Sequence, residues 1–205
     1  MKYRLLATSG LAACLALTAA ACSSSPSSPA TSAPASSAPA SLGATTAGDF
    51  GPGCASVPKT GAGSFTGMST APVATAASAN PVLSTLVTAV KKADLADTLN
   101  SASGITVFAP DNAAFAKIPA ATLNQVLANK AELTKILTYH VVAGRYTPSQ
   151  LAAGTPLKTL EGATVTPALM GSTYEVNSAD VVCGNVQTAN ATVYIINTVL
   201  MPPSS

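Results

Sequence analysis

Between residues 80 and 200 the spacing of hydrophobic residues changes from one half of the segment to the other. In the first half, apolar residues recur three and four positions apart in segments 83–90, 123–127 and 133–137, which is the spacing of one face of a helix. Asn80 can cap the first of these segments, and Pro81 suits the first position of a helix. The spacing therefore predicts that the first half is mainly helical.

The second half consists of short runs of β-branched residues separated by Gly, Asn and Pro. Such runs are typical of strands, and they cover residues 164–166, 174–176, 180–182 and 192–196. An earlier run, 105–109, predicts one strand among the helices. The predicted fold class is therefore α+β, with helices packed against a small antiparallel sheet.

Two polar segments predict further helix starts. Thr147-Pro148-Ser149-Gln150 is a capping box with proline inside it, in which the first and last side chains satisfy backbone N–H groups. Asp111 follows Pro110 and can cap a short helix that begins at Asn112. Because a cap explains these polar residues, neither segment indicates a catalytic site.

The first 21 residues have the layout of a secretory signal peptide. Lys2 and Arg4 form a basic start, residues 5–21 carry no charge, and three alanines precede Cys22. No later stretch approaches the length of a membrane-spanning helix. We therefore expect export of the chain.

The small residues before Cys22 and the serines after it are similar to the cleavage site of bacterial lipoproteins, in which the cysteine thiol receives a diacylglycerol. Two or three acyl chains hold a protein firmly to a membrane, so a lipid on Cys22 would anchor the chain to the outer face of the cell membrane. Lipoproteins usually have Leu three residues before the cysteine, where this chain has Ala19. Lipidation of Cys14 and ordinary cleavage near Ala21 are the alternatives.

Residues 22–48 are rich in Ser, Ala and Pro and include neither a charged nor an aromatic side chain. Such a segment cannot bury enough apolar area to offset the loss of chain entropy on folding. We expect a disordered linker over residues 22–48 and a single domain over residues 49–205.

The composition argues against several classes of function. Charged residues make up 9% of the chain, against roughly 25% in a typical soluble domain. Beyond Lys2 and Arg4, eight basic residues balance eight acidic ones, so we expect no basic stripe and no nucleic-acid partner. With one histidine and four cysteines, we expect no metal site, no cofactor and no enzymatic activity.

Three segments of the predicted domain resemble the signature boxes of fasciclin domains, in the same order and spacing: Thr106–Phe115, Ile136–Val142 and Thr192–Pro202. A closer likeness, over about residues 51–203, is to the fasciclin-domain surface lipoproteins of mycobacteria and related actinobacteria and to their secreted relatives. It rests on Gly51-Pro52-Gly53-Cys54, on Asn177–Gly184 and on Thr188–Thr192. The resemblance implies a wedge-shaped β-sandwich flanked by helices, and an extracytoplasmic adhesion or binding module rather than a catalyst.

Cys54 and Cys183 are the only cysteines of the predicted domain. In an oxidising compartment an even pair predicts a disulfide, and the family members of the closer likeness carry a cysteine at both positions. Closing a loop of about 130 residues would stabilise the fold by at most about 4–5 kcal/mol. Two free thiols are the alternative.

His140 is the only side chain expected to act as a base near neutral pH. It ends an amphipathic segment, and no Gly-x-Ser-x-Gly nucleophile elbow accompanies it, so a buried structural hydrogen bond is the first interpretation. In fasciclin domains the matching histidine is usually treated as structural, and the Tyr-His pair has been linked to adhesion in some animal members. Contact with a partner through Tyr139 and His140 is the second interpretation, and catalysis by His140 is the third.

Two asparagines need a separate interpretation. Asn197 stands where the fasciclin family more often has Asp, so a turn or strand-end hydrogen bond is favoured over a carboxylate-dependent contact. Asn190-Ala191-Thr192 matches the N-glycosylation sequon, but bacteria of the lipoprotein-bearing type usually lack that machinery. We expect this stretch to be a turn that enters the last strand.

The main functional hypothesis is a cell-surface lipoprotein whose domain is an adhesion or protein-interaction module in the cell envelope, with an unidentified envelope or host-surface protein or glycan as its partner. The alternative is an extracytoplasmic carrier of a small apolar ligand, which requires an apolar cavity on the order of several hundred Å³. A filled core with an exposed apolar patch would favour adhesion. A hydrolase would have to use His140.

Overall fold

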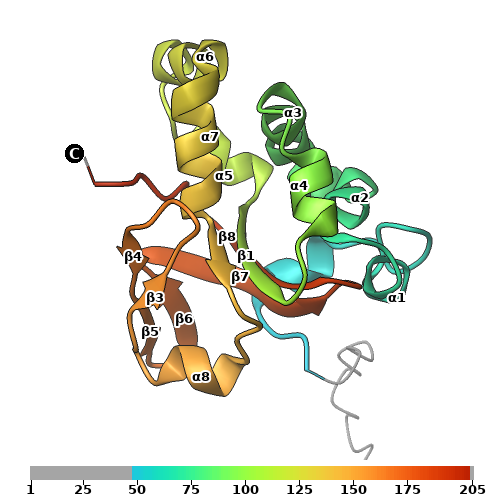
Figure 1. Cartoon of the computed structure of the whole chain (residues 1–205). Helices are drawn as coiled ribbons and strands as arrows, with labels where there is room; N and C mark the ends of the chain where they lie inside the picture. Colours follow the sequence, from blue (N-terminus) through green and yellow to red (C-terminus); the bar gives the residue numbers. More distant parts are fainter. Residues whose placement is uncertain (1–47, 204–205) are drawn as a thin grey trace, which may run out of the picture. The chain divides into compact units, whose positions relative to one another are not determined.

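Strands β1 (Ile105–Pro110) and β8 (Ala191–Ile196) run side by side through the middle of the structure, a computed structural model that describes residues 48–203 (Figure 1). They are parallel neighbours, and every residue of both strands is buried. They belong to a six-stranded sheet with the order β2-β1-β8-β7-β6-β5. Burial on both faces explains why both strands are almost continuously apolar rather than alternating.

The other strand pairs are antiparallel. The remaining strands of the large sheet are β2 (Val141–Ala143), β5 (Pro167–Met170), β6 (Thr173–Val176) and β7 (Ala179–Gln187), while β3 (Leu157–Lys158) and β4 (Thr164–Val165) form a separate two-stranded sheet. The α+β class is confirmed. The expectation of an antiparallel sheet is corrected at β1 and β8, because the long connection between them, which contains helices as well as the other strands, allows a parallel pairing.

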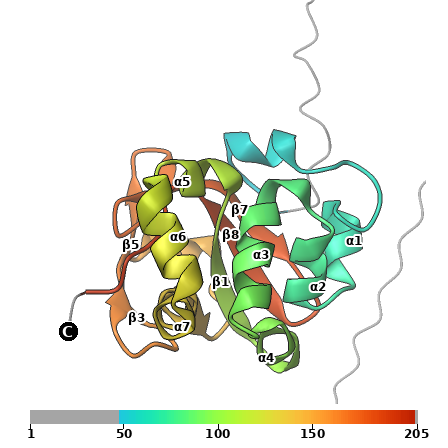
Figure 2. The same cartoon turned by 90° about the horizontal axis from the view of Figure 1, so that it is seen from above.

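Most helices lie over one face of the sheet, as the view from above shows (Figure 2). Before β1 come η1 (Pro52–Ser56), α1 (Phe65–Ser69), α2 (Val73–Ser78), η2 (Pro81–Leu83), α3 (Ser84–Lys92) and α4 (Ala96–Ser101), and after it come α5 (Asn112–Ala116), α6 (Ala120–Ala128), α7 (Lys130–Tyr139) and α8 (Pro148–Ala152). No helix within residues 48–203 is long and apolar enough to cross a membrane.

The central strands send alternate side chains into two hydrophobic clusters. The cluster under the helices receives Val107, Ala109, Val193 and Ile195, and the cluster that includes residues of α8, β3 and β4 receives Phe108, Tyr194 and Ile196. Because successive residues of a strand point to opposite faces, the same two strands build both cores. Removing either strand would therefore open both clusters.

The predicted helix starts are confirmed. Asn80 accepts a hydrogen bond from the Val82 N–H at the start of η2, and Asp111 accepts one from the Ala114 N–H at the start of α5. Thr147 and Gln150 form the complete capping box of α8. The signal peptide, Cys14, Cys22 and nearly all of the predicted linker lie outside the described residues, so the predictions on them stay predictions.

Candidate functional site

His140 ends α7 and has only 2% of its surface exposed. Its Nε2 accepts a hydrogen bond from the Leu200 N–H at 2.9 Å, which places the ring proton on Nδ1, and Nδ1 donates to the Ile136 carbonyl at 2.8 Å. Burial lowers the pKa of His140 to about 4, so the ring is neutral near pH 7. His140 joins α7 to the C-terminal segment, with no free nitrogen to act as a base.

Tyr139 is also buried, with 3% of its surface exposed. Its hydroxyl donates to the Thr164 carbonyl at 3.1 Å and accepts from the Asn177 side-chain amide at 2.8 Å. Burial raises the pKa of Tyr139, which keeps the hydroxyl protonated as a donor. The Tyr139–His140 pair therefore has an interior, structural role, and it offers no surface through which a partner could be contacted.

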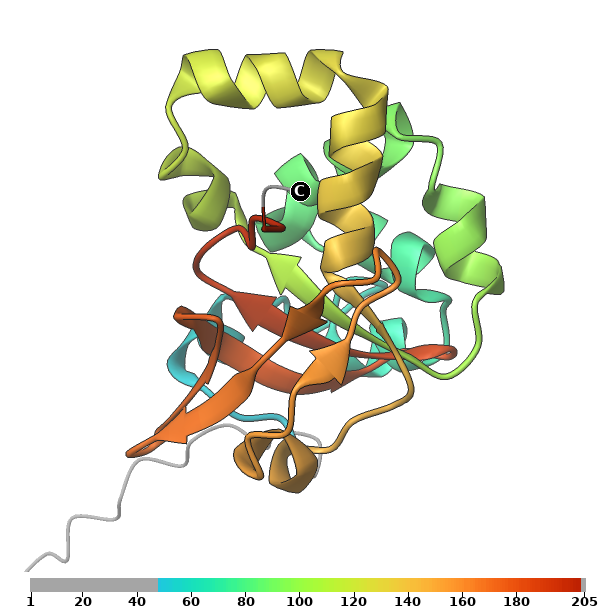
Figure 3. The ribbon, with the colours of Figure 1, turned by 60° about the vertical axis from the view of Figure 1, so that its left-hand side comes forward.

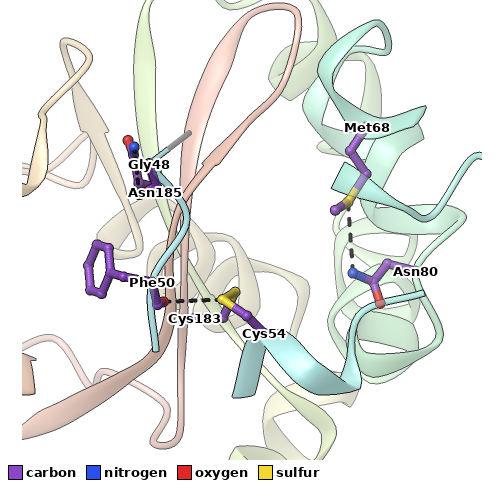
Figure 4. The surroundings of a disulfide bond; sticks show 7 residues. All are labelled: Gly48, Phe50, Cys54, Met68, Asn80, Cys183 and Asn185. Carbon is purple, nitrogen blue, oxygen red and sulfur yellow. Dashed lines mark hydrogen bonds between the residues drawn. A yellow bond between two sulfur atoms is a disulfide. The ribbon is translucent and has the colours of Figure 1, made fainter. Parts of the chain in front are cut away.

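Cys54 and Cys183 form the predicted disulfide, which ties η1 to β7 (Figure 4). Beside it, Phe50 pairs with Gly184 through two backbone hydrogen bonds of 3.2 and 2.7 Å. A Cβ on Gly184 would lie 2.2 Å from the Phe50 ring, so only glycine fits beneath that ring. The segment from Phe50 to Cys54 is therefore held to β7 by backbone pairing, by close packing and by a covalent bond.

Asn197 lies just after β8 and bonds to the start of β7. Its side-chain N–H donates to an Asp180 carboxylate oxygen at 2.7 Å, and its side-chain oxygen accepts from the Asp180 N–H at 3.1 Å. The interpretation of Asn197 as a strand-end hydrogen-bonding residue is the one that this geometry supports. A carboxylate at this position would face that of Asp180.

Asn190 has a larger structural role than the sequence indicated. Its side-chain oxygen accepts from the Val73 N–H at 2.8 Å, and its side-chain N–H groups donate to the carbonyls of Leu99 at 2.7 Å and Ala102 at 2.6 Å. One side chain thus holds the start of α2, the end of α4 and the turn before β8. The expected turn is present, and the sequon asparagine that begins it is fully used inside the fold.

An apolar cavity of about 80 Å³ lies between the helices and the sheet. Val107, Val193 and Ile195 are among the residues that form its floor, and its walls come from α2, α3 and α4 on one side and α7 on the other. Figure 1 shows α7 and the α3–α4 pair on either side of β1 at this place. The carrier alternative required an apolar cavity of several hundred Å³, and this one is smaller; the sequence could not define its lining, because the residues that form it are distant in the chain.

Few large apolar side chains are exposed in the described part of the chain: Leu160, Leu169, Met170 and Met201. Leu169 and Met170 are neighbours at the end of the edge strand β5, beside the turn into β6. The β5–β6 hairpin can be followed in orange in Figure 3. Their surfaces are 42% and 59% exposed. An uncharged, apolar strand end at a sheet edge is a surface suited to contact with another molecule.

Comparison with known protein families gives one family for this chain. The model of the fasciclin domain matches residues 81–202. The immunogenic protein MPB70 of Mycobacterium bovis is 53% identical over 167 residues, which cover 77% of this chain and 85% of that protein. The cell surface glycolipoprotein MPB83 of the same species is 51% identical over 162 residues, covering 75% of this chain and 72% of the relative.

A solved structure shows the same fold at lower identity. It is that of a FAS1 domain pair from the insect cell adhesion molecule fasciclin I, with a TM-score of 0.55 and 18% identity. The match covers 66% of this chain and 52% of that one. The fold and the mycobacterial relatives expected from the sequence are both confirmed.

Proposed function

The chain belongs to the fasciclin domain family, and from that premise we propose that it is a cell-surface lipoprotein whose domain is an adhesion or protein-interaction module in the cell envelope. The observation that carries the proposal is the 51% identity, over 75% of this chain, to a protein named as a cell surface glycolipoprotein. The lipoprotein-like sequence around Cys22 supports the same location. The partner would be an envelope or host-surface protein or glycan.

The described site supports recognition rather than catalysis. The one histidine of the chain is buried, neutral and bonded at both nitrogens, which removes the expected base of a hydrolase. The exposed apolar pair Leu169–Met170 offers a contact surface at the sheet edge. We propose this pair as the centre of the interaction surface.

The carrier hypothesis receives less support. Ligand pockets typically have volumes of about 300–1,000 Å³, whereas the cavity between the helices and the sheet has about 80 Å³. A cavity of that size is too small to enclose a whole drug-sized or lipid-sized molecule. We therefore do not propose that the protein carries an enclosed ligand.

The anchoring part of the proposal is tested by Cys22→Ser in the full chain produced in an actinobacterial host. We expect the variant to lose its lipid and to leave the membrane fraction, with Cys14→Ser as the matched control that remains membrane-bound. Mass spectrometry of the mature N-terminal peptide should show a lipid-modified Cys22 with no residue before it. An unmodified wild-type protein in the medium would overturn the anchoring.

The interaction part is tested by changing the strand end and measuring binding to isolated cell envelopes. We expect Leu169→Ser combined with Met170→Ser to weaken binding about tenfold, or about 1.4 kcal/mol, since burial of an apolar side chain contributes about 1.5–3 kcal/mol. Met201→Ser, which also removes an exposed apolar side chain, is the control and should bind as the wild type does. Equal weakening by both changes would contradict a specific role for the β5 end.

A further inference from the structure

The cavity beneath the helices is lined almost entirely by carbon, and the polar groups beside it are already bonded within the protein. His140 uses both ring nitrogens, the Thr138 hydroxyl donates to the Thr134 carbonyl at 2.8 Å, and the Asn80 side-chain oxygen accepts from the Val82 N–H at 3.1 Å. An occupant would therefore find no free hydrogen-bonding partner at these positions. Hydrocarbon is the chemistry that fits.

The size of the cavity limits the occupant to a small hydrocarbon group. An engineered apolar cavity of about 150 Å³ stays dry and binds benzene, which has six carbons. The cavity here, at about 80 Å³, is roughly half as large and would hold about three or four carbons. The cavity therefore suits the end of a hydrocarbon chain better than a whole ligand.

Charge at the cavity rim indicates which group lies at the other end of the bound hydrocarbon chain. Lys91, Thr98 and Leu160 are among the exposed residues that line the cavity, and they mark its solvent-facing rim. Neither Lys91 nor its exposed neighbour Lys92 has an ion pair within residues 48–203. The following segment carries Asp94, whose carboxylate pairs with Lys130, and Asp97 on α4. The rim therefore has a surplus of positive charge beside an apolar opening.

We propose that this cavity binds the hydrocarbon end of an anionic amphiphile, whose charged group lies outside against Lys91. The site goes beyond the proposed adhesive function, since it depends neither on the lipid at Cys22 nor on a protein partner at β5. Leu160, which is 48% exposed, covers the part of the ligand's hydrocarbon chain that leaves the cavity. The ligand class is a single-chain carboxylate or phosphate.

The first test uses straight-chain carboxylates from butanoate to decanoate with the purified protein, followed by NMR of the methyl groups of Val193, Ile195 and Leu86. Each CH₂ that enters the cavity should tighten the Kd about fourfold, and the gain should level off once the cavity is full. Chemical-shift changes at methyl groups elsewhere, or an affinity that keeps increasing through decanoate, would indicate binding to open apolar surface and would overturn the proposal.

The second test fills the cavity. Ala77→Leu on α2 and Ala96→Leu on α4 place added carbons against it, and each should weaken hexanoate binding about tenfold or more, because the space for the chain is lost. Ala121→Leu, at an exposed position of α6, is the matched control and should leave the Kd unchanged. Thermal unfolding identifies any variant that fails to fold. Unchanged binding by a folded filled variant would overturn the site.

The third test concerns the charged end. Lys91→Gln should weaken hexanoate binding about two- to fivefold, as expected for loss of an exposed ion pair, and should leave hexanol binding unchanged. Lys92→Gln makes the same charge change beside the rim and is the control. Equal effects of the two changes would overturn the placement of the charged group against Lys91, and hexylammonium binding as tightly as hexanoate would overturn the anionic assignment.

Discussion

Replacement of His140 by glutamine separates the hydrogen bonds of this residue from its titration. A glutamine amide can donate to the Ile136 carbonyl and accept from the Leu200 N–H, the two bonds that the imidazole makes. Glutamine does not ionise between pH 4 and 8. The variant therefore keeps the chemistry of the contact and removes its pH dependence.

The magnitude follows from the difference in pKa between the folded and unfolded chain. Burial lowers the folded pKa of His140 to about 4, and an unfolded histidine titrates at about 6.5. Above pH 6.5 both states hold a neutral ring, so no stability is lost. As the pH falls below 6.5 the unfolded state takes up the proton first, and the free energy of unfolding decreases by about 1.4 kcal/mol per pH unit, or about 3 kcal/mol in total by pH 4.

The assay is urea unfolding of the wild type and of His140→Gln at steps between pH 7.5 and pH 4. Carboxylates titrate in both proteins, so their contribution cancels in the difference between the two free energies of unfolding. We expect this difference to be constant above pH 6.5 and to shift by about 3 kcal/mol in favour of the variant by pH 4. A difference that stays constant across the whole range would refute the neutral, buried state assigned to His140.

Three further changes test the structure through the free energy of unfolding, measured by denaturant unfolding. Asn190→Ala should lower the free energy of unfolding by about 3 kcal/mol, because the change leaves part-buried backbone groups at the start of α2 and the end of α4 without partners. Hydrogen exchange should become faster in these two helices at lower denaturant concentration than in β8. Asn197→Asp should destabilise the domain at pH 7 through repulsion between the introduced carboxylate and Asp180, and acidification below about pH 5 should restore stability as one carboxylate is protonated. Replacing Cys54 and Cys183 by serine should cost about 2–5 kcal/mol in denaturant unfolding without abolishing the fold, and equal stability of the reduced and oxidised wild type would contradict this.

The elements with a strong period could be predicted from the sequence. The helical spacing in 83–90 and 133–137 corresponds to α3 and α7, and the run 192–196 corresponds to β8. These segments bury one helical face or both faces of a strand, so the spacing of their apolar residues reflects which positions are buried. The disulfide was also predictable, because only two cysteines of the domain can pair.

Other elements leave no local pattern. Strand β5 begins with Pro167 and ends in exposed Leu169 and Met170, so its residues show neither the alternation nor the β-branched content of a strand. Helices α2 and α4 are six residues long, too short for an apolar period to stand out. Their positions depend on contacts from distant parts of the chain.

Asparagines illustrate why these contacts could not be predicted. The Asn100 side-chain oxygen lies at the end of α4 and accepts from the Ala74 N–H at the start of α2, and that of Asn112 accepts from the Thr85 N–H at the start of α3. Each satisfies an N-terminal N–H group of another helix, as a cap does from the adjacent position. In the sequence they are only polar residues of short helices.

The same reasoning limits what can be predicted about the site. Tyr139 and His140 attract attention in the sequence because they are the residues with the most versatile chemistry, yet both are buried and bonded within the protein. A buried polar group must be hydrogen-bonded. Once the end of its helix packs into the core, a histidine therefore uses its ring nitrogens for bonds within the protein. The surfaces that we propose for recognition are the apolar end of β5 and the cavity rim at Lys91. Neither surface has a motif in the sequence, and both can be identified only when exposure and distant contacts are known.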